Sequence, residues 1–348
     1  MASSSASSPL PLAVSLGEPA GIGPDILLTL WNRAIEGQLQ LPEFIVFGDP
    51  NFLLERAALL GLPLDIHEAD LKNPNDQAPD HKMRVCALQN PMVAEPGRAD
   101  PTNGVAVVEA ITSSVEAVRA GMARGIVTLP INKKSLYDCG FEFPGHTEFL
   151  ASLADEKWGG ENSHHPVMML AGPQLRSVPL TIHIPISEVP AALNAELVEE
   201  TISITHSEMM DKFKIPNPRI AVSGLNPHAG EQGAMGREEI EVIEPVIAQL
   251  QKKGVNCFGP LPADTMFHEQ ARNQYDVAIC MYHDQALIAA KALAFDETVN
   301  VTLGLPFVRT SPDHGTAFEI AGSGTAKCES VLAAIKLADH LTSEGASQ

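Results

Sequence analysis

The sequence predicts an α/β protein whose parallel sheets are covered by helices on both faces. Two observations predict this fold class: apolar strand-like segments alternate with amphipathic helical segments, and the chain is 348 residues long. Strands that alternate with helices favour parallel pairing, because each helix provides the crossover between two strands. At roughly 150 residues per domain, this length is sufficient for about two domains with separate hydrophobic cores.

The first strand, turn and helix follow a leader rich in serine and alanine, a composition typical of disorder. Leu10 to Leu16 predicts a strand, GEPAGIGPD (17–25) predicts a turn, and the apolar segment after it predicts a helix. A second strand, at Phe44 to Asp49, also precedes a helix. The periodic segment Val105 to Met122 predicts a long helix that leads into a strand at Gly125 to Pro130.

The rest of the chain continues this alternation, and no internal repeat interrupts it. The clearest helix spans Arg237 to Lys253, with apolar residues at helical spacing, acids in its first turn and lysines in its last. Pro245 should kink this helix, because proline removes a hydrogen bond within it. Four further segments predict strands: Pro166 to Leu170, Val178 to Ile184, Arg219 to Leu225 and Asp276 to Tyr282.

Charge and composition exclude several classes of protein. The net charge is −20, from 43 acidic against 23 basic residues, so the general field repels nucleic acid and anionic membranes. No apolar run approaches the roughly 20 residues that cross a bilayer, and no signal peptide is recognisable, so we expect a cytoplasmic protein. The five cysteines are widely spaced without a CxxC pair, which predicts reduced thiols.

Histidines follow three of the predicted strands. His183 lies near the end of VPLTIHI, His228 just after RIAVSGL, and His283 directly after DVAICMY. In an open α/β sheet, ligands bind at the carboxyl ends of strands, where side chains from separate strands converge. Three neutral imidazoles with open coordination positions can form a catalytic metal site. The alternative for each one taken alone is an ordinary loop histidine.

Acidic and polar residues near these segments could assist the chemistry. Asp284 and Asp264 could orient a metal-bound imidazole or transfer a proton, although helix capping and turn formation explain them equally well. In FPGHTEFLA, we expect Thr147 to cap a helix, so that His146 and the first backbone N–H groups face an anion. A histidine that simply precedes a capped helix is the alternative.

An anionic substrate would need basic groups that act against the acidic field. Lys291, Asn300 and Arg309 are candidates, because a planar guanidinium and a point charge suit phosphate or carboxylate, whereas solvated surface groups are the alternative. The sequence contains no Rossmann GxGxxG after a predicted strand, no phosphate-binding GxxxxGK[ST] loop and no GxSxG elbow. The residues alone therefore predict a metal-assisted enzyme for a small anionic substrate.

Eight motifs, in this order, resemble one known family, the 4-hydroxythreonine-4-phosphate dehydrogenases of pyridoxal phosphate (vitamin B6) biosynthesis. They run from Gly17 to Gly322, nearly the whole chain, and eight ordered matches are far more specific than any single one. The motifs are GEPAGIGPD, VTLPINKK, FPGHTEFLA, GLNPHAGE, GPLPADT, MYHDQ, VNVTLGLPFVRTS and DHGTAFEIAG.

The resemblance implies a fold similar to isocitrate and isopropylmalate dehydrogenases, with two α/β/α domains, a cleft between them and no Rossmann fingerprint. It implies a homodimer with an active site shared between the subunits, and no nucleic-acid or membrane partner. We place the first domain, with the cofactor loop, at residues 1–135 plus 296–348. The second domain, with metal ligands and dimer contacts, is placed at residues 136–295.

The family reaction is the NAD(P)-linked oxidation of 4-phosphooxy-L-threonine to 2-amino-3-oxo-4-phosphooxybutanoate, which then loses CO₂ to give 3-amino-2-oxopropyl phosphate. A divalent cation (Zn, Co or Mg) and NAD or NADP are the implied cofactors. The resemblance assigns residues to three groups of roles: metal ligands His183, His228 and His283, one of them from the partner subunit; substrate-binding His146, Thr147, Lys291, Asn300 and Arg309; and cofactor-binding His314, Gly315 and Thr316.

Two other functions remain open from the sequence. A dehydrogenase of the same family could act on another phosphorylated hydroxy acid, such as a threonate or erythronate, or on a cyclic diol acid. A protein of a different class could use the same residues to bind a phosphorylated metabolite without catalysis.

Overall fold

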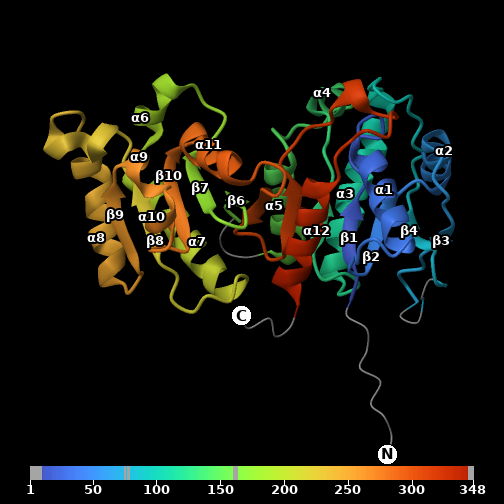
Figure 1. The fold of residues 1–348 in the computed structure, drawn as a ribbon, viewed down its shortest axis with the longest axis horizontal. Helices are drawn as coiled ribbons and strands as arrows, with labels where there is room; N and C mark the ends of the chain where they lie inside the picture. Colours follow the sequence, from blue (N-terminus) through green and yellow to red (C-terminus); the bar gives the residue numbers. More distant parts are fainter. Residues whose placement is uncertain (1–9, 74–75, 77–78, 160–163, 344–348) are drawn as a thin grey trace, which may run out of the picture. The chain divides into compact units, whose positions relative to one another are not determined.

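The computed structural model describes residues 10–73, 76, 79–159 and 164–343, and the serine- and alanine-rich leader lies outside them. The chain forms two compact units (Figure 1). The first unit comprises residues 10–164 and 305–343, and the second comprises residues 165–304. Both units mix strands and helices, which confirms the predicted α/β class.

The first unit contains a parallel sheet of strand order β3-β4-β2-β1-β5-β12. Its predicted strands and helices form within a few residues of the predicted bounds, because each carries its own apolar periodicity. Its elements are β1 (Leu12–Ser15), α1 (Gly23–Ile35), β2 (Phe44–Gly48), α2 (Pro50–Leu60), β3 (Ile66–Glu68), β4 (Met83–Ala87), η1 (Pro101–Asn103), α3 (Gly104–Arg119), β5 (Ile126–Thr128), α4 (Lys133–Asp138), α5 (His146–Trp158), β12 (Arg309–Pro312), η5 (Phe318–Ile320) and α12 (Glu329–Thr342).

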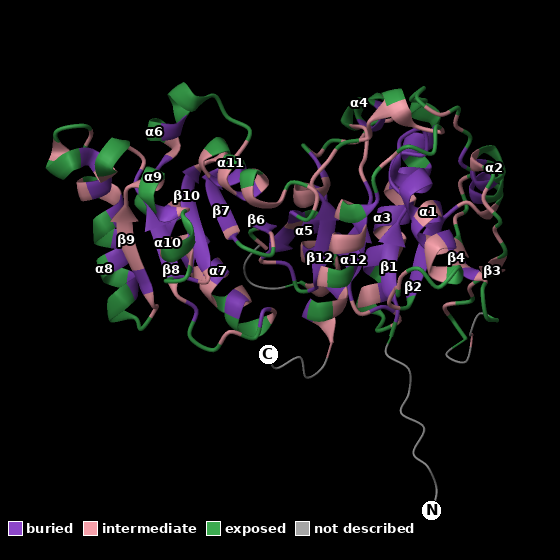
Figure 2. Ribbon diagram, in the orientation of Figure 1, coloured by how far each residue is buried: buried purple, intermediate pink, exposed green. Residues whose placement is uncertain are grey.

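Helices cover both faces of this sheet, as predicted. Ala13 and Ile126 belong to a core cluster with residues of α3 and α5. Their strand neighbours Leu12, Val14 and Val127 are equally buried, and because side chains alternate along a strand, they point to the opposite face. Helix α12 contacts β1, β5 and β12, and α1 packs against α12. Figure 2 shows these central strands as buried, with exposed residues on the outer surfaces of the helices.

The boundary between the units lies later than our prediction of 135/136 and 295/296. Residues 136–164 belong to the first unit, because α4 and α5 pack on α3 and place Leu136, Phe149 and Leu150 in the same core cluster. The chain returns to the first unit after Gly304. Turn residues in 131–145 favoured an earlier boundary, but the apolar face of α5 decides where this segment packs.

The second unit contains a sheet of strand order β11-β6-β7-β10-β8-β9. Helix α11 packs on β7 and β10, whereas α7 contacts β11, β6 and β7 together with α8. Its elements are β6 (Val167–Ala171), β7 (Arg176–Thr181), η2 (Ile186–Glu188), α6 (Val189–Ala192), α7 (Ala195–Asp211), β8 (Ile220–Ser223), η3 (Pro227–Gly233), η4 (Glu239–Ile243), α8 (Glu244–Lys252), β9 (Cys257–Leu261), α9 (Ala263–Met266), α10 (Glu269–Arg272), β10 (Val277–Tyr282), α11 (His283–Ala294) and β11 (Val299–Leu303).

This second sheet is not wholly parallel, which corrects the simplest form of the prediction. Strand β6 is antiparallel to both β7 and β11. A turn in which Gly172 N–H donates to the Leu175 carbonyl connects β6 and β7 directly, and so short a connection permits only antiparallel pairing. Strands β7, β10, β8 and β9 pair in parallel, so their carboxyl ends meet at one edge.

The helix predicted at Arg237 to Lys253 has two parts. A π-helical turn, η4, precedes the α-helix α8, and Pro245 occupies the second position of α8. The two parts are continuous, since Glu244 N–H donates to the Glu239 carbonyl, and the proline, which has no N–H to donate, lies just after the change of helix type. The kink itself stays a prediction.

Candidate functional site

Two histidines meet at the carboxyl end of the second sheet. Strands β7 and β10 are parallel neighbours with Thr181 opposite Tyr282, so the two strands end at the same level. His183 follows β7 by two residues, and His283 begins α11 directly after β10. The centres of their rings lie 6.0 Å apart. The pairing of β7 with β10 therefore brings together two of the three predicted metal ligands.

Both rings line a cavity of about 250 Å³ in the second unit. His183 adopts a left-handed backbone conformation (φ +53°), which few residues other than glycine adopt and which often marks a functional position. Apolar side chains form much of the wall. The lining residues are Thr181, His183, Ile184, Ile186, Val189, Tyr282, His283 and Asp284.

A carboxylate orients the imidazole of His283. The Asp284 Oδ1 atom lies 2.7 Å from His283 Nδ1, so Nδ1 donates to the carboxylate and Nε2 is left for another partner. Metal-bound histidines in proteins almost always have such a partner on the second ring nitrogen. Since a nitrogen ligates at roughly 2 Å, two rings on one ion lie roughly 5–6 Å apart, so the observed spacing fits a shared cation.

His228 stands apart from this pair in a single chain. It lies in the turn η3, and its Nδ1 lies 3.1 Å from Glu231 Oε2. Across the residues that the structure describes, no three histidine, cysteine or carboxylate side chains gather closely enough to hold an ion. The three-histidine metal site consequently stays a prediction, in which a second copy of the chain supplies the missing ligand.

The turn around His228 has an unusual backbone. Six consecutive residues have positive φ angles, and four of them are not glycine. Each non-glycine residue in this conformation costs about 1–2 kcal/mol, so the turn is maintained by contacts with its surroundings. The residues and φ angles are His228 (53°), Ala229 (51°), Gly230 (79°), Glu231 (43°), Gln232 (54°) and Gly233 (92°).

Asp264, the second candidate for proton transfer, is exposed in the short helix α9. Helix α9 contacts η3, which carries His228, so Asp264 lies on an element beside the His228 turn. Asp284, by contrast, is hydrogen-bonded directly to His283. The geometry favours Asp284 over Asp264 as the carboxylate that orients a ligand.

The first unit contains a buried basic group. Arg309, at the start of β12, is 3% exposed, and its Nε and Nη2 atoms lie 3.0 and 2.6 Å from Thr128 Oγ1 at the end of β5. Burial lowers the pKa of Arg309 to about 10, although nearby Glu148 opposes the shift. A guanidinium suits the planar, bidentate binding of an anionic group, which is why Arg309 stays a candidate for substrate binding.

His146 belongs to the same group of side chains. Its Nε2 atom is buried and has no hydrogen-bond partner among the described residues. Burial lowers the pKa of His146 well below its ordinary value, and the positive charges of Arg309 and Lys133 add to the shift. His146 is therefore neutral at pH 7, with a buried ring nitrogen available for a ligand.

The capping prediction for Thr147 is wrong. Helix α5 begins at His146, and Gly145 occupies the N-cap position, so Thr147 already lies inside the first turn. The Gly145 carbonyl accepts the first hydrogen bond of the helix from Phe149 N–H. Lys133 was overlooked in the sequence, although the motif VTLPINKK contains it.

Lys291 and Asn300, the other predicted substrate-binding residues, belong to the second unit. The Lys291 ammonium lies 5.7 Å from the centre of the Phe295 ring. Asn300 lies in β11, and its Oδ1 atom is buried without a hydrogen-bond partner within the described part of the chain. A buried amide oxygen without a partner is the kind of group that a ligand satisfies.

The predicted cofactor loop packs on the GEPAGIG turn in the first unit. The Thr316 carbonyl accepts from Ile22 N–H, and a Cβ on Gly21 would lie only 3.0 Å from that carbonyl oxygen. His314 Nε2 is buried without a partner among the described residues, and Gly315 is exposed with open space beside it. Open space beside Gly315 leaves room for the backbone to approach a ligand closely.

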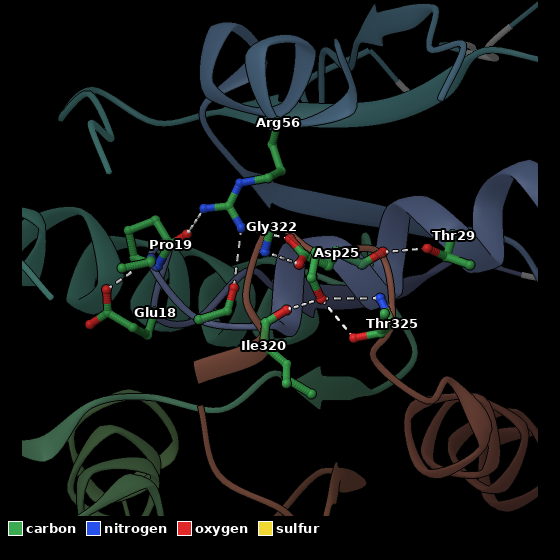
Figure 3. Close-up of polar contacts among 11 residues, drawn as sticks. Glu18, Pro19, Asp25, Thr29, Arg56, Ile320, Gly322 and Thr325 are labelled. Carbon is green, nitrogen blue, oxygen red and sulfur yellow. Dashed lines mark hydrogen bonds and ion pairs between the residues drawn. The ribbon is translucent and has the colours of Figure 1, made fainter. Parts of the chain in front are cut away.

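A buried ion pair, which sequence reasoning missed, fixes these loops (Figure 3). Arg56 Nη1 lies 2.6 Å from Asp25 Oδ1, and both side chains are 1% exposed. Arg56 also donates to the Pro19 carbonyl, and Asp25 Oδ2 accepts from Gly322 N–H. The pair therefore joins α2, the GEPAGIG turn and the C-terminal loop. In the sequence, the only sign of this ion pair is that both charged residues lie among apolar residues.

Glu18 is a second overlooked group in that turn. It is 2% exposed, and its Oε1 atom accepts from Ala20 N–H. Burial raises the pKa of Glu18, despite opposing hydrogen bonds from Ala20 and Ser135. Its place after β1, at the carboxyl edge of the first sheet, is where ligand-binding groups gather in α/β proteins.

In the described part of the chain, no helix combines the length and apolarity that a bilayer crossing requires. The two α/β units, with polar side chains gathered after strand ends, define an α/β enzyme. The model of one protein family, described as pyridoxal phosphate biosynthetic protein PdxA, matches residues 40–338. The chain belongs to this family.

Relatives and solved structures agree with this assignment. The chain is 49% identical over 340 residues to a 4-hydroxythreonine-4-phosphate dehydrogenase of Methylorubrum extorquens, a match covering 97% of this chain and 95% of the relative. The crystal structure of the enzyme of that name from Klebsiella pneumoniae matches with a TM-score of 0.84 and 36% identity, over 96% of this chain and all of that one. A terephthalate 1,2-cis-dihydrodioldehydrogenase from Burkholderia xenovorans matches with a TM-score of 0.62 and 26% identity, over 95% and 98% of the chains.

Proposed function

We propose that this chain oxidises 4-phosphooxy-L-threonine with NAD or NADP to 2-amino-3-oxo-4-phosphooxybutanoate, which loses CO₂ to give 3-amino-2-oxopropyl phosphate in pyridoxal 5′-phosphate biosynthesis. The names of relatives that cover nearly the whole chain support this substrate. The single structural observation that carries the chemistry is the pairing of His183 with His283 in a cavity at the strand ends.

These two histidines would hold a divalent metal ion together with His228 from the partner subunit of a homodimer. Imidazole ligands favour Zn²⁺ or Co²⁺ over Mg²⁺. When bound, such an ion lowers the pKa of the substrate hydroxyl and stabilises the negative charge that develops on oxygen. Asp284 keeps the His283 ring in the tautomer that presents Nε2.

Basic and neutral polar groups would bind the rest of the substrate. Arg309 offers a guanidinium that Thr128 holds in one orientation, and Lys291 and Asn300 supply further contacts to the phosphate or carboxylate. Neutral His146 can exchange a hydrogen bond with the substrate without adding charge. Thr147, in the first turn of α5, supplies a hydroxyl beside it.

The nicotinamide cofactor would lie along the loop that contains His314, Gly315 and Thr316. The oxidised cofactor would accept the hydride from the carbon that bears the hydroxyl, and the hydroxyl proton would pass to solvent or to a nearby carboxylate. Asp284 and Asp264 are the two candidates for this carboxylate. Asp284 already accepts from His283, so its second oxygen would receive the proton.

The test is an NAD(P) reduction assay on the purified, metal-loaded protein. We expect reduction with 4-phosphooxy-L-threonine and no reduction without substrate. Equal or faster turnover of a phosphorylated threonate or erythronate, or of a cis-dihydrodiol carboxylate, would reject the substrate while keeping the enzyme class. Calorimetric binding of the phosphorylated substrate without turnover under any metal would identify a binding protein instead.

A further inference from the structure

Few residues of the turn that carries His228 are buried. Within η3, only Gly230 is buried, and the side chain of His228 is 63% exposed. Apolar contacts therefore do not explain why residues 228–232 keep their left-handed backbone. The explanation must lie in polar contacts made beneath the turn.

Two neighbouring carboxylates make those contacts. Glu238 Oε2 accepts from Asn226 Nδ2 at 2.6 Å, and Glu239, at the start of η4, is the buried one, 1% exposed. Its Oε1 atom accepts from Asn226 N–H at 2.8 Å, and its Oε2 atom accepts from Asn226 Nδ2 at 3.0 Å. Glu239 thus bonds twice to the residue that precedes the turn. A buried carboxyl with both oxygens engaged fixes the direction in which the chain enters the turn.

The fit between Glu239 and the turn is close. A Cβ on Gly230 would lie 2.6 Å from Glu239 Oε2, so only glycine allows the turn to pass over the carboxyl group. Gly224 is similarly restricted, with Glu239 Oε1 at 3.1 Å from its added Cβ. Glu239 also begins the π-helical turn, and such irregular turns are frequent at functional sites.

We infer that Glu239 and Asn226 are positioning residues, which hold the left-handed turn so that it presents His228 as a metal ligand. This inference rests on the proposed role of His228. The same turn brings Glu231 Oε2 within 3.1 Å of His228 Nδ1, so that Nδ1 donates to the carboxylate. Glu239 and Asn226, which we call the clamp, therefore hold the backbone at the third histidine, and Glu231 on the same turn favours one tautomer of its ring.

The test compares Co²⁺ affinity of the full-length protein and of its Glu239→Ala, Glu239→Gln and Glu241→Ala variants. Glu241 is an exposed residue of the same π-helical turn and serves as the matched control. We expect Glu239→Ala to weaken Co²⁺ binding 10- to 100-fold, as for other residues that orient metal ligands. Glu239→Gln retains an acceptor for Asn226 N–H and should recover part of the affinity, and Glu241→Ala should change it less than twofold.

A double variant distinguishes an effect that acts through His228 from a general loss of structure. If Glu239 acts through His228, then Glu239→Ala combined with His228→Ala should bind Co²⁺ no more weakly than His228→Ala alone. Wild-type affinity in Glu239→Ala, or an equal further loss in the double variant, would overturn the inference.

Hydrogen exchange of the metal-free protein tests the clamp without relying on the metal. Ala234 and Met235 N–H donate within the turn to the carbonyls of Glu231 and Gly230, and they should exchange faster in Glu239→Ala. Unchanged exchange would refute the clamp itself. Unchanged Co²⁺ affinity in His228→Ala would instead reject the proposed ligand role of His228.

Discussion

In the first unit, the basic groups proposed to bind substrate lie among buried partners, whereas the histidines of the second unit stand on exposed segments after strand ends. Arg309 is nearly inaccessible and is held by Thr128, and His146 has a buried ring nitrogen. His283 is 37% exposed, and its carboxylate partner is the adjacent residue.

If these residues bind as we propose, the difference indicates two kinds of binding site. A buried arginine cannot adjust easily, so the proposed anion-binding group of the first unit would be organised before the anion binds, and binding would lose little conformational entropy there. The second unit presents two histidines of an incomplete ligand set, whose third member comes from another chain in our proposal. Metal affinity should then depend on protein concentration, because the third ligand requires dimer formation. Anion affinity at the buried basic group should not depend on protein concentration.

The strongest test of this contrast is the replacement of the two histidines that meet. We expect His183→Ala or His283→Ala to lower turnover roughly 10³-fold or more and to reduce bound metal, because several kcal/mol of charge stabilisation are lost. The fold should survive, since both residues follow strand ends. His268→Ala, an exposed histidine of the same unit, is the control. Full activity with full metal occupancy would remove the residue from the site.

The organisation of the first unit can be tested at its buried ion pair. Arg56→Met should lower the free energy of unfolding by about 3–5 kcal/mol, because Asp25 remains buried without its partner. Urea denaturation measures this change, and Arg98→Met, at an exposed ion pair with Glu95, should change it by less than about 1 kcal/mol. Equal effects of the two variants would show that the loops do not depend on the pair.

Removal of the buried arginine should affect substrate binding more than turnover. We expect Arg309→Ala to raise KM for 4-phosphooxy-L-threonine roughly 10- to 100-fold, because a charge-assisted hydrogen bond is lost. Arg309→Lys keeps the charge but not the planar fork, so its KM should lie between those of the wild type and of Arg309→Ala. An unchanged KM in a folded variant would show that the guanidinium does not contact the substrate.

The smallest expected effect concerns pH. The folded-state pKa of His146 lies well below its unfolded value of about 6.5, so the unfolded chain binds a proton first as the pH falls. The contribution of His146 to stability is therefore complete above about pH 6.5 and declines as the pH falls towards the folded-state pKa. His146→Gln should flatten this acid dependence, measured as the unfolding midpoint against pH. An identical pH dependence in the wild type and in His146→Gln would show that other groups cause the loss of stability in acid.

The sequence by itself determined the local elements and the composition of the site. Apolar periodicity located the strands at whose ends His183, His228 and His283 lie, because strand and helix patterns depend on neighbouring residues. The ordered motifs identified the family, which the comparisons confirmed. Local rules were less reliable at helix starts, where Thr147 satisfied the capping pattern but the N-cap is Gly145, two residues earlier.

Only the tertiary structure decided which of these elements became neighbours. His183 and His283 meet because β7 pairs with β10, Arg309 reaches Thr128 across 181 positions of sequence, and Asp25 bonds to an arginine 31 residues away. The left-handed turn at His228 depends likewise on a carboxyl beyond its own residues. Such contacts form because distant apolar faces are buried together, and no local pattern encodes which faces will meet.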